Sequence, residues 1–567
     1  MEFIFSRLYK IELKKKRNMK KLMLTAAALA AGIAAGAQDW TDALRYSENE
    51  YEGTARTMAM GNAFTALGGD MGSLGINPAG SAVARKSQFT FSAGPNITIG
   101  TAKGNYTPDG GIAFGKNIRQ TDTKFNIPNL GGMVNFNTGR SRGLKNWSMG
   151  FVVNNTRTYD DNLTAKGINY NTSAFGQLAA RATDLAQEGA FVAGDLSKDE
   201  IFDKLSPVDW NIANAYRAGS IWALSDKEFA GISEYENGDG KIVLGKSGLN
   251  QIYGRTRTGR KSDFVYNLSF NISDIFFFGA NIGVTHARYT STDFMREDAV
   301  SPDDFDVIFN NEDGSTTTTH FVSAKNTYSY QADATGVYGK FGIILTPWKG
   351  LRIGAAIQTP TQFTVKENIS YCSESTYDVS KFSGDAKASG NYEYILRSPM
   401  RSNFGLAYTI GSFGLISADY EVTNYRSMRF RVPNTSDNSD FDSANAGIYD
   451  LCGVQHYFRA GAEVNVAFLS IRAGYSLKTA GQTYEYDGNS LVKAPKASVQ
   501  TVSGGLGFSF GGFFADLAAV GYFYPTEYIR PYPDYIFGDN DIPDPYSPEI
   551  RYKRNLIKLV ATIGVRF

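Results

Sequence analysis

The last thirteen residues of the chain, NLIKLVATIGVRF, constrain its fold more than any other segment. Every second residue from Ile557 to the terminal Phe567 is apolar, and mostly polar residues or glycine lie between them. A period of two with one apolar face predicts a half-buried strand. An apolar last strand that ends in an aromatic residue is typical of outer-membrane β-barrels, so we expect the barrel-assembly machinery to recognise Phe567. An edge strand of a periplasmic sandwich is the alternative.

The same alternation recurs along the chain, for example in WSMGFVVNN, FVYNLSFNI, FGLAYTI and IRAGYSL. Glycine and aromatic residues are abundant, with 59 Gly, 33 Tyr and 38 Phe. This distributed pattern is the signature of a transmembrane β-barrel. Arg472 is assigned to the lumen, because a lipid-facing arginine at mid-depth costs about 2–4 kcal/mol.

Short and long joins between the alternating segments predict fourteen strands. They are expected near 89–99, 127–138, 146–158, 262–273, 275–294, 326–346, 350–371, 389–410, 413–431, 454–466, 468–486, 496–511, 513–523 and 553–567. A further candidate, Gly110 to Lys116, is assigned to an outer loop at 100–126, because single-chain bacterial barrels have even strand numbers. The sequence therefore predicts an all-β fold, a 14-stranded transmembrane antiparallel β-barrel over residues 89–567.

Residues 1–37 are expected to form a secretory signal peptide with an upstream extension. A basic segment ends at Lys21, the apolar run Leu22–Ala34 follows, and Ala35-Gly36-Ala37 supplies a small-residue cleavage site. This order of basic segment, apolar run and cleavage site predicts export, with Gln38 as the first mature residue. Together with the strand pattern, it predicts location in the outer membrane of a Gram-negative cell.

Residues 38–88 precede the first strand and are expected to form a hatch that fills the lumen. Fourteen strands enclose more space than the side chains of an eight-stranded barrel fill, but less than an open sixteen-stranded channel. The stretch MGNAFTALGGDMGSLGINPAG within this region contains six glycines, which permit a compact fold with positive φ angles. Asn77 stands before Pro78 and is therefore biased to extended geometry.

The segment GTARTMAMGNAFTALGGDMGSLGINPAGSA resembles the hatch of the FadL/TodX family, outer-membrane transporters for long-chain fatty acids and other hydrophobic compounds. The matching positions are Gly53, Ala55, Met60, Gly61, Ala63, Phe64, Ala66, Asp70, Asn77, Pro78, Ala79 and Gly80. The chain departs from the family at Asn62, usually a second glycine, and at Ile76, where an aromatic is common. The resemblance is strong over residues 50–100.

The resemblance implies passive transport of hydrophobic small molecules. Substrate is caught on outer loops, passes to a luminal apolar pocket and leaves sideways through a gap in the wall as the hatch shifts. The implied hatch and gating residues are Gly61, Phe64, Asp70, Asn77, Pro78, Ala79 and Gly80. In the family the gap comes from an inward kink in an early strand, and 146–158 is the candidate here, although it contains no proline. A hatch that never moves is the alternative.

The long outer loop, residues 159–261, contains helical runs, one of which opens with a capping box at Ser197 and Glu200. Its apolar residues are candidates for an exposed ligand-capture surface: Leu178, Leu185, Ile212, Tyr216, Ile221 and Trp222. A lid that packs on neighbouring loops for stability is the alternative.

No catalytic or metal-binding pattern is present in the sequence. His286, His320 and His456 are dispersed, whereas iron and zinc sites need clustered ligands. We therefore expect neither an enzyme nor a cofactor. The net charge of +1, without a basic stripe, makes nucleic acid an improbable partner.

Several questions stay open at this level. A plugged surface lipid-binding or adhesin barrel, a haemin receptor with a lone histidine ligand and an outer-membrane hydrolase are the alternative functions. The expected partners are a hydrophobic, fatty-acid-like molecule, outer-membrane lipid and lipopolysaccharide, and the expected state is a monomer.

Cys372 and Cys452 permit a disulfide in an exported protein.

Overall fold

The computed structural model describes residues 38–105, 113–236, 242–310, 315–379, 383–435, 437–487, 490–534 and 546–567. The expected signal peptide and residues 110–112 of the candidate strand at 110–116 therefore lie outside the described residues, and residues 113–116 form no strand. No helix within these ranges is long and apolar enough to cross a membrane.

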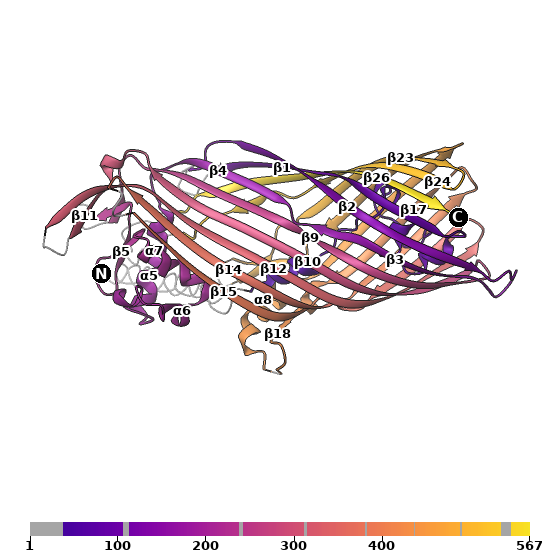
Figure 1. Ribbon diagram of the computed structural model, residues 1–567, viewed down its shortest axis with the longest axis horizontal. Helices are drawn as coiled ribbons and strands as arrows, with labels where there is room; N and C mark the ends of the chain where they lie inside the picture. Colours follow the sequence, from indigo (N-terminus) through magenta and orange to yellow (C-terminus); the bar gives the residue numbers. More distant parts are fainter. Residues whose placement is uncertain are drawn as a thin grey trace, which may run out of the picture.

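Fourteen antiparallel strands form one closed barrel, as the sequence predicts (Figure 1). In chain order they are β1 (Gln88–Asn105), β2 (Ile118–Asn137), β3 (Leu144–Thr158), β9 (Leu249–Ile272), β10 (Phe276–Ala299), β12 (Thr316–Trp348), β13 with β14 (Leu351–Gln358, Gln362–Tyr377), β15 with β16 (Gly384–Arg397, Arg401–Ile410), β17 (Gly414–Asn424), β19 (Val454–Val466), β20 (Leu469–Thr479), β23 (Ser498–Phe510), β24 (Phe513–Phe523) and β26 (Glu549–Arg566). Pro360 and Pro399 lie at the two breaks within spanning strands, where a missing N–H does least harm.

The ends of the chain close the barrel. The last strand, β26, pairs with β24 on one edge and with β1 on the other, in a register that runs from Gln88↔Arg566 to Asn105↔Glu549. This pairing leaves the wall without a free edge at the junction between first and last strands, which is what a barrel in lipid requires.

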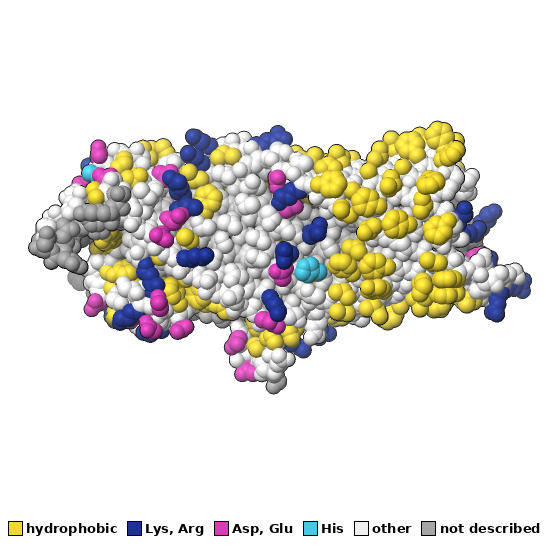
Figure 2. Space-filling view, viewed as in Figure 1, with side chains coloured by type: hydrophobic (Ala, Val, Ile, Leu, Met, Phe, Trp, Pro, Cys, Tyr) yellow, Lys and Arg dark blue, Asp and Glu magenta, His cyan; other side chains and the backbone are white. Residues whose placement is uncertain are grey.

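An apolar belt surrounds one end of the barrel, the end at which β26 finishes. Figure 2 shows hydrophobic side chains gathered over this end and charged side chains scattered over the rest of the visible face. Outward-facing residues of the belt include Phe151, Leu268, Phe341 and Ile563, all exposed. Arg472 is buried on the lumen side, as predicted. The belt is the lipid-facing surface of a membrane-spanning barrel.

Tight turns join the strands at the belt end. Ser273 and Asp274, both with φ of 59°, join β9 to β10, and Gly511 has a φ of 61° between β23 and β24. Two left-handed residues give a turn whose twist matches antiparallel strands. Several strands continue far beyond the belt at the other end, where β4 (Asp161–Asn169) and β11 (Asp306–Asn310) add to the sheet.

The remaining elements are short. The helices are α2 (Trp40–Ser47), α3 (Ala55–Ala59), α4 (Gly80–Val83), α5 (Ala174–Gln187), α6 (Ile201–Lys204), α7 (Trp210–Arg217) and α8 (Asp442–Leu451), with a 3-10 turn η1 (Met71–Ser73) in the hatch. The short strands are β5 (Ile221–Ala223), β6 (Phe229–Gly231), β7 (Glu234–Glu236), β8 (Ile242–Leu244), β18 (Arg429–Arg431), β21 (Tyr484–Asp487), β22 (Ser490–Lys493) and β25 (Glu527–Ile529). Cys372 and Cys452 are both free thiols, so the disulfide that the sequence permits is absent.

Candidate functional site

The hatch, residues 38–88, packs inside the barrel as a compact, glycine-rich fold. Gly61 and Asn62 both adopt φ near 60°, at 62° and 59°. Asn62 replaces the second glycine of the family pattern, and asparagine is one of the few other residues that tolerate this conformation. Phe64 is fully buried beside Met60 and Leu67 in an apolar cluster.

Asp70 and Asn77, two of the residues that the resemblance singled out, hold the hatch together and fix it to the wall. The Asp70 carboxylate accepts hydrogen bonds from Thr54 Oγ1 at 2.6 Å and from the Gly72 N–H at 2.9 Å. The Asn77 Nδ2 group donates to the Thr65 carbonyl at 2.6 Å and to the Ile343 carbonyl of β12 at 3.1 Å. Asp70 therefore ties two parts of the hatch together, and Asn77 also ties the hatch to β12.

The wall receives the hatch through glycines on its inner face. A Cβ added at Gly342 would lie 1.9 Å from Asn77 Oδ1, and one at Gly279 would lie 2.6 Å from the Pro78 carbonyl carbon. Within the hatch, the Gly69 N–H donates to the Gly80 carbonyl at 2.8 Å. Inward glycines therefore let the segment from Asn77 to Gly80, Ala79 included, approach the wall more closely than any side chain permits.

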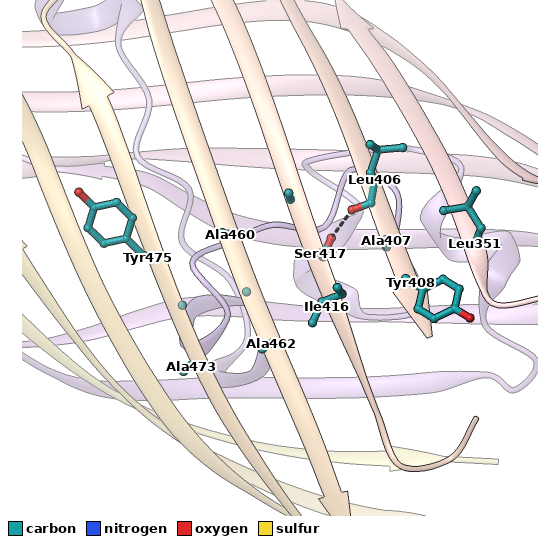
Figure 3. A pocket seen from close by; sticks show the side chains of 13 residues that line it. Leu351, Leu406, Ala407, Tyr408, Ile416, Ser417, Ala460, Ala462, Ala473 and Tyr475 are labelled. Atoms are coloured by element: carbon teal, nitrogen blue, oxygen red, sulfur yellow. Dashed lines mark hydrogen bonds between the residues drawn. The ribbon is translucent and has the colours of Figure 1, made fainter. Parts of the chain in front are cut away.

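The hatch lies directly against the backbone of β19 and β20, because glycines face it there. A Cβ at Gly474 would lie 2.2 Å from the Gly61 nitrogen, so hatch and strand backbones are in contact there. On the opposite face of the same strands lies a recess of about 590 Å³ with alanines along its floor and Leu406, Tyr408 and Tyr475 around it (Figure 3). This recess faces the bilayer, so it offers no luminal pocket.

A seam interrupts the hydrogen-bonded wall between β2 and β3. Strands β2 and β3 pair only from Asn137↔Asn146 to Asn129↔Asn154. Beyond this pair, residues 118–128 of β2 have no backbone ladder to β3 or β4 among the described residues. We call this unpaired boundary the seam. It lies between residues 118–128 of β2 and residues 155–158 of β3.

Irregular backbone on both sides produces the seam. In β2, Ile127 and Pro128 form a bulge opposite Ala93 of β1, and proline cannot donate to a ladder. In β3, the register with β9 shifts between Asn155 and Arg157. Both β2 and β3 are therefore irregular beside the seam, and the proline lies in β2 rather than in the predicted strand 146–158.

The hatch covers the inner side of the seam. The N–H of Glu50 donates to the Thr156 carbonyl at 2.6 Å, and the N–H of Glu52 donates to the Asn155 carbonyl at 3.1 Å. The hatch backbone thus bonds β3 at the two residues that follow the end of its ladder with β2. On the seam itself, Asn155 Nδ2 donates to Asn126 Oδ1 at 2.7 Å, so side chains and the hatch replace the missing ladder.

Alternating carboxylates in the same hatch segment meet cations from the wall. Glu48 accepts a hydrogen bond from Arg157 at 2.7 Å, and Glu52 pairs with the buried Lys558. Burial alone would raise the pKa of the Glu50 carboxyl, but the nearby Lys478 and Lys558 hold that pKa below its usual value. Glu50 Oε2 has no hydrogen-bond partner within the described part of the chain. The segment is therefore held by charge as well as by its backbone.

The lumen beside this segment is tightly filled. Two interior cavities adjoin it, one lined by Lys261 and Arg401 and one by Glu52 and Asn154, each of about 10 Å³. A volume of this size holds at most one water molecule. The structure is a closed state, in which an apolar ligand beside residues 46–52 would require the hatch to move.

The candidate capture residues of the outer loop do not form the exposed surface that the sequence suggested. Ile212 and Ile221 are fully buried, Leu178 is nearly so, and the side chains of Leu185, Tyr216 and Trp222 pack partly buried against the same cluster. This cluster joins the loop helices to the inner faces of the strands and to α2. The loop is thus packed as a lid over the end of the barrel away from the belt (Figure 1). Its amphipathic faces find partners in the barrel, which the loop sequence alone does not reveal.

The histidines remain dispersed in the fold. His286 bonds Thr335, His320 bonds Asp378, and His456 bonds Tyr420. No group of three or more His, Cys, Asp or Glu residues suited to a metal ion occurs in the described ranges.

Matches to known proteins are found among solved structures only. No family model and no curated protein matches the chain. Among solved structures, it is similar to the toluene transporter TodX of P. putida (12% identity, 91% of this chain and 99% of that chain, TM-score 0.46). It is also similar to a Pseudomonas aeruginosa FadL homologue (12% identity, 91% of this chain and 99% of that chain, TM-score 0.47). The CymD monoaromatic hydrocarbon channel is similar too (10% identity, 91% of this chain and 97% of that chain, TM-score 0.41). These TM-scores lie below 0.5, so the architecture rests on the strand pairing of this chain.

That architecture is the one that the FadL/TodX resemblance implies. It combines fourteen strands, a hatch in the lumen and a partly helical outer loop. Glu48, Glu50 and Glu52 are the functional candidates that sequence reasoning missed. The signal was available in the stretch SENEYE, where three carboxylates alternate in a segment expected to lie inside a barrel.

Proposed function

We propose that this chain is an outer-membrane passive transporter of hydrophobic small molecules, long-chain fatty acids or similar compounds. Substrate enters from the lid side, the hatch shifts, and the substrate leaves sideways between β2 and β3. The observation that carries this proposal is the seam, where no backbone ladder joins β2 to β3 and where Glu50 and Glu52 of the hatch bond the backbone of β3 instead. Withdrawal of that segment, together with release of the Asn155–Asn126 hydrogen bond, would open the seam without breaking any strand pairing.

The depth of the seam supports lateral release. Below it, β2 and β3 carry outward-facing apolar residues such as Leu130 and Phe151. A hydrophobic molecule that leaves at this level enters the bilayer, whereas release into periplasmic water would cost about 25 cal/mol per Å² of exposed apolar surface. We propose a monomer as the working unit, in contact with outer-membrane lipid and lipopolysaccharide and assembled through its last strand.

Uptake of labelled oleate tests this function. An expression host without its own fatty-acid transporter should take up oleate faster when it produces this chain than with an empty vector. Removal of residues 39–52, the part of the hatch with the seam contacts, should change that rate while the barrel still folds.

A plugged surface lipid-binding or adhesin barrel is the second candidate, because the cavities beside the hatch are only about 10 Å³ in volume. Oleate that binds to producing cells but never enters them, with or without residues 39–52, would favour it. A haemin receptor is a weaker candidate, and a haem absorbance band in the purified protein would revive it.

A further inference from the structure

A recess of about 490 Å³ lies on the outer face of the seam. Residues 124–126 of β2, the junction of β3 and β4 and parts of β9 and β10 form its walls. Asn126 lines this recess and also accepts the hydrogen bond from Asn155 across the seam. The recess, which we call the outer recess, is therefore the first space that a molecule leaving through the seam would meet.

The floor of the outer recess depends on a glycine. Gly259 has a φ of 125°, and a Cβ there would lie 2.1 Å from the Arg288 carbonyl oxygen. At this residue β9 changes partner, from β3 at Arg260↔Thr158 to β4 at Arg257↔Asp161. The recess thus lies where β9 passes from β3 to β4, next to the seam.

The outer recess spans the upper boundary of the apolar belt. Phe125 and Phe264 line its apolar side, and Phe125 is 74% exposed. Further along the same strands, away from the belt, the outward positions are occupied by Arg260 on β9 and by Arg288 on β10. A molecule in the recess meets aromatic rings toward the bilayer and cations toward the outside.

The cations of the outer recess are not fully compensated. Lys124 pairs with Asp160 at 2.7 Å, and Arg288 pairs with Asp333 at 2.9 Å. Arg260 lies directly opposite Arg288 in the β9–β10 ladder and has no carboxylate partner among the described residues. Like charges directly opposite one another destabilise a sheet, so an anion at this point would relieve their repulsion.

We propose that the outer recess binds the carboxylate head group of a long-chain amphiphile as it passes the seam, with Arg260 as the group that recognises the charge. The tail lies along Phe125 and Phe264 in the bilayer. This inference rests on the proposed transport function and narrows its substrate class to anionic amphiphiles, in preference to neutral hydrocarbons.

The test compares uptake of labelled oleate and of oleyl alcohol, which has the same tail and no charge. Three proteins are compared in the transporter-free host: wild type, Arg260→Gln and Arg119→Gln, the last an exposed β2 arginine outside the recess. We expect Arg260→Gln to reduce oleate uptake at low concentration about tenfold, the size of a lost charge-assisted hydrogen bond. Its oleyl alcohol uptake and heat-modifiable gel migration should match wild type, and Arg119→Gln should change neither uptake.

The other outcomes separate the two proposals. If Arg260→Gln takes up oleate as fast as wild type does, and oleyl alcohol as fast as wild type does, the carboxylate site is overturned and transport is left intact. An equal fall for both compounds would show a structural role for Arg260 and would also overturn it. Wild type that takes up neither compound would refute the transport function itself. If mass spectrometry finds a phosphate-bearing lipid on wild type but not on Arg260→Gln, with oleate uptake unchanged, the recess is a membrane-lipid site instead.

Discussion

The carboxylate of Glu52 pairs with the ammonium group of Lys558, and both side chains are fully buried inside the barrel. The pair joins the hatch to the last strand, and the Glu52 carboxylate also accepts a hydrogen bond from Asn126 of the seam at 2.9 Å. Removal of one partner from a buried ion pair leaves an uncompensated charge and costs about 3–5 kcal/mol. Loss of either partner should therefore weaken the contact of the hatch with the wall.

Glu52→Gln should lower the free energy of unfolding by about 3–5 kcal/mol, because Lys558 loses its anionic partner. The double variant Glu52→Leu, Lys558→Met should lie much closer to wild type, since neither charge is then buried alone. Thermal unfolding followed by heat-modifiable gel migration measures both. A double variant as unstable as the single one would show that the charge pairing is not what matters.

Gly342→Ala should loosen the hatch. Its Cβ would lie 1.9 Å from Asn77 Oδ1, so Asn77 must give up its bonds to the wall, at a cost of about 1–3 kcal/mol. Gly504→Ala is the matched control, because the nearest atom to its Cβ is 3.7 Å away. Limited proteolysis of the hatch should be faster in the first variant and unchanged in the second. Equal cleavage of both would mean that the glycine contact does not anchor the hatch.

Ile212→Asp should detach the lid without unfolding the barrel. Ile212 is fully buried in the cluster that joins the lid to the strands, and an unpaired buried carboxylate is not tolerated there. Trypsin should then cut at Arg181 and Arg217, while the barrel keeps its heat-modifiable migration. Leu224→Asp serves as control, because Leu224 is 59% exposed. A lid that resists trypsin in the Ile212 variant would contradict its assignment as a packed cover.

The strands within the membrane can be predicted from the sequence, because lipid on one face and the lumen on the other impose a strict alternation. All fourteen were found, but the outer parts of several were missed. β9 begins at Leu249 and β12 at Thr316, whereas the pattern indicated starts near 262 and 326. Beyond the belt both faces of a strand meet polar surroundings or the lid, so the alternation of apolar residues that marks a lipid-facing strand is lost.

The seam could not be predicted in the same way, because it is a missing contact between two strands that each look regular. The resemblance pointed to an inward kink in the strand 146–158. In the structure that strand has a register shift against β9, and Pro128 marks a bulge in the neighbouring β2. The family motif located the anchored half of the hatch, from Gly53 to Gly80. The contacts that cover the seam come from Glu50 and Glu52, just before the motif begins.

The most direct measurement of the central claim is oleate uptake through a seam that has been locked shut. Asn126→Cys with Asn155→Cys places a disulfide across the seam, in a background where Cys372 and Cys452 are replaced by serine. Val134→Cys with Met149→Cys is the matched control, because these residues join the same two strands where they already pair. If substrate passes between β2 and β3, the oxidised seam disulfide should abolish uptake and its reduction should restore uptake. The control disulfide should have no effect. Unchanged uptake through the oxidised seam would contradict lateral passage between β2 and β3.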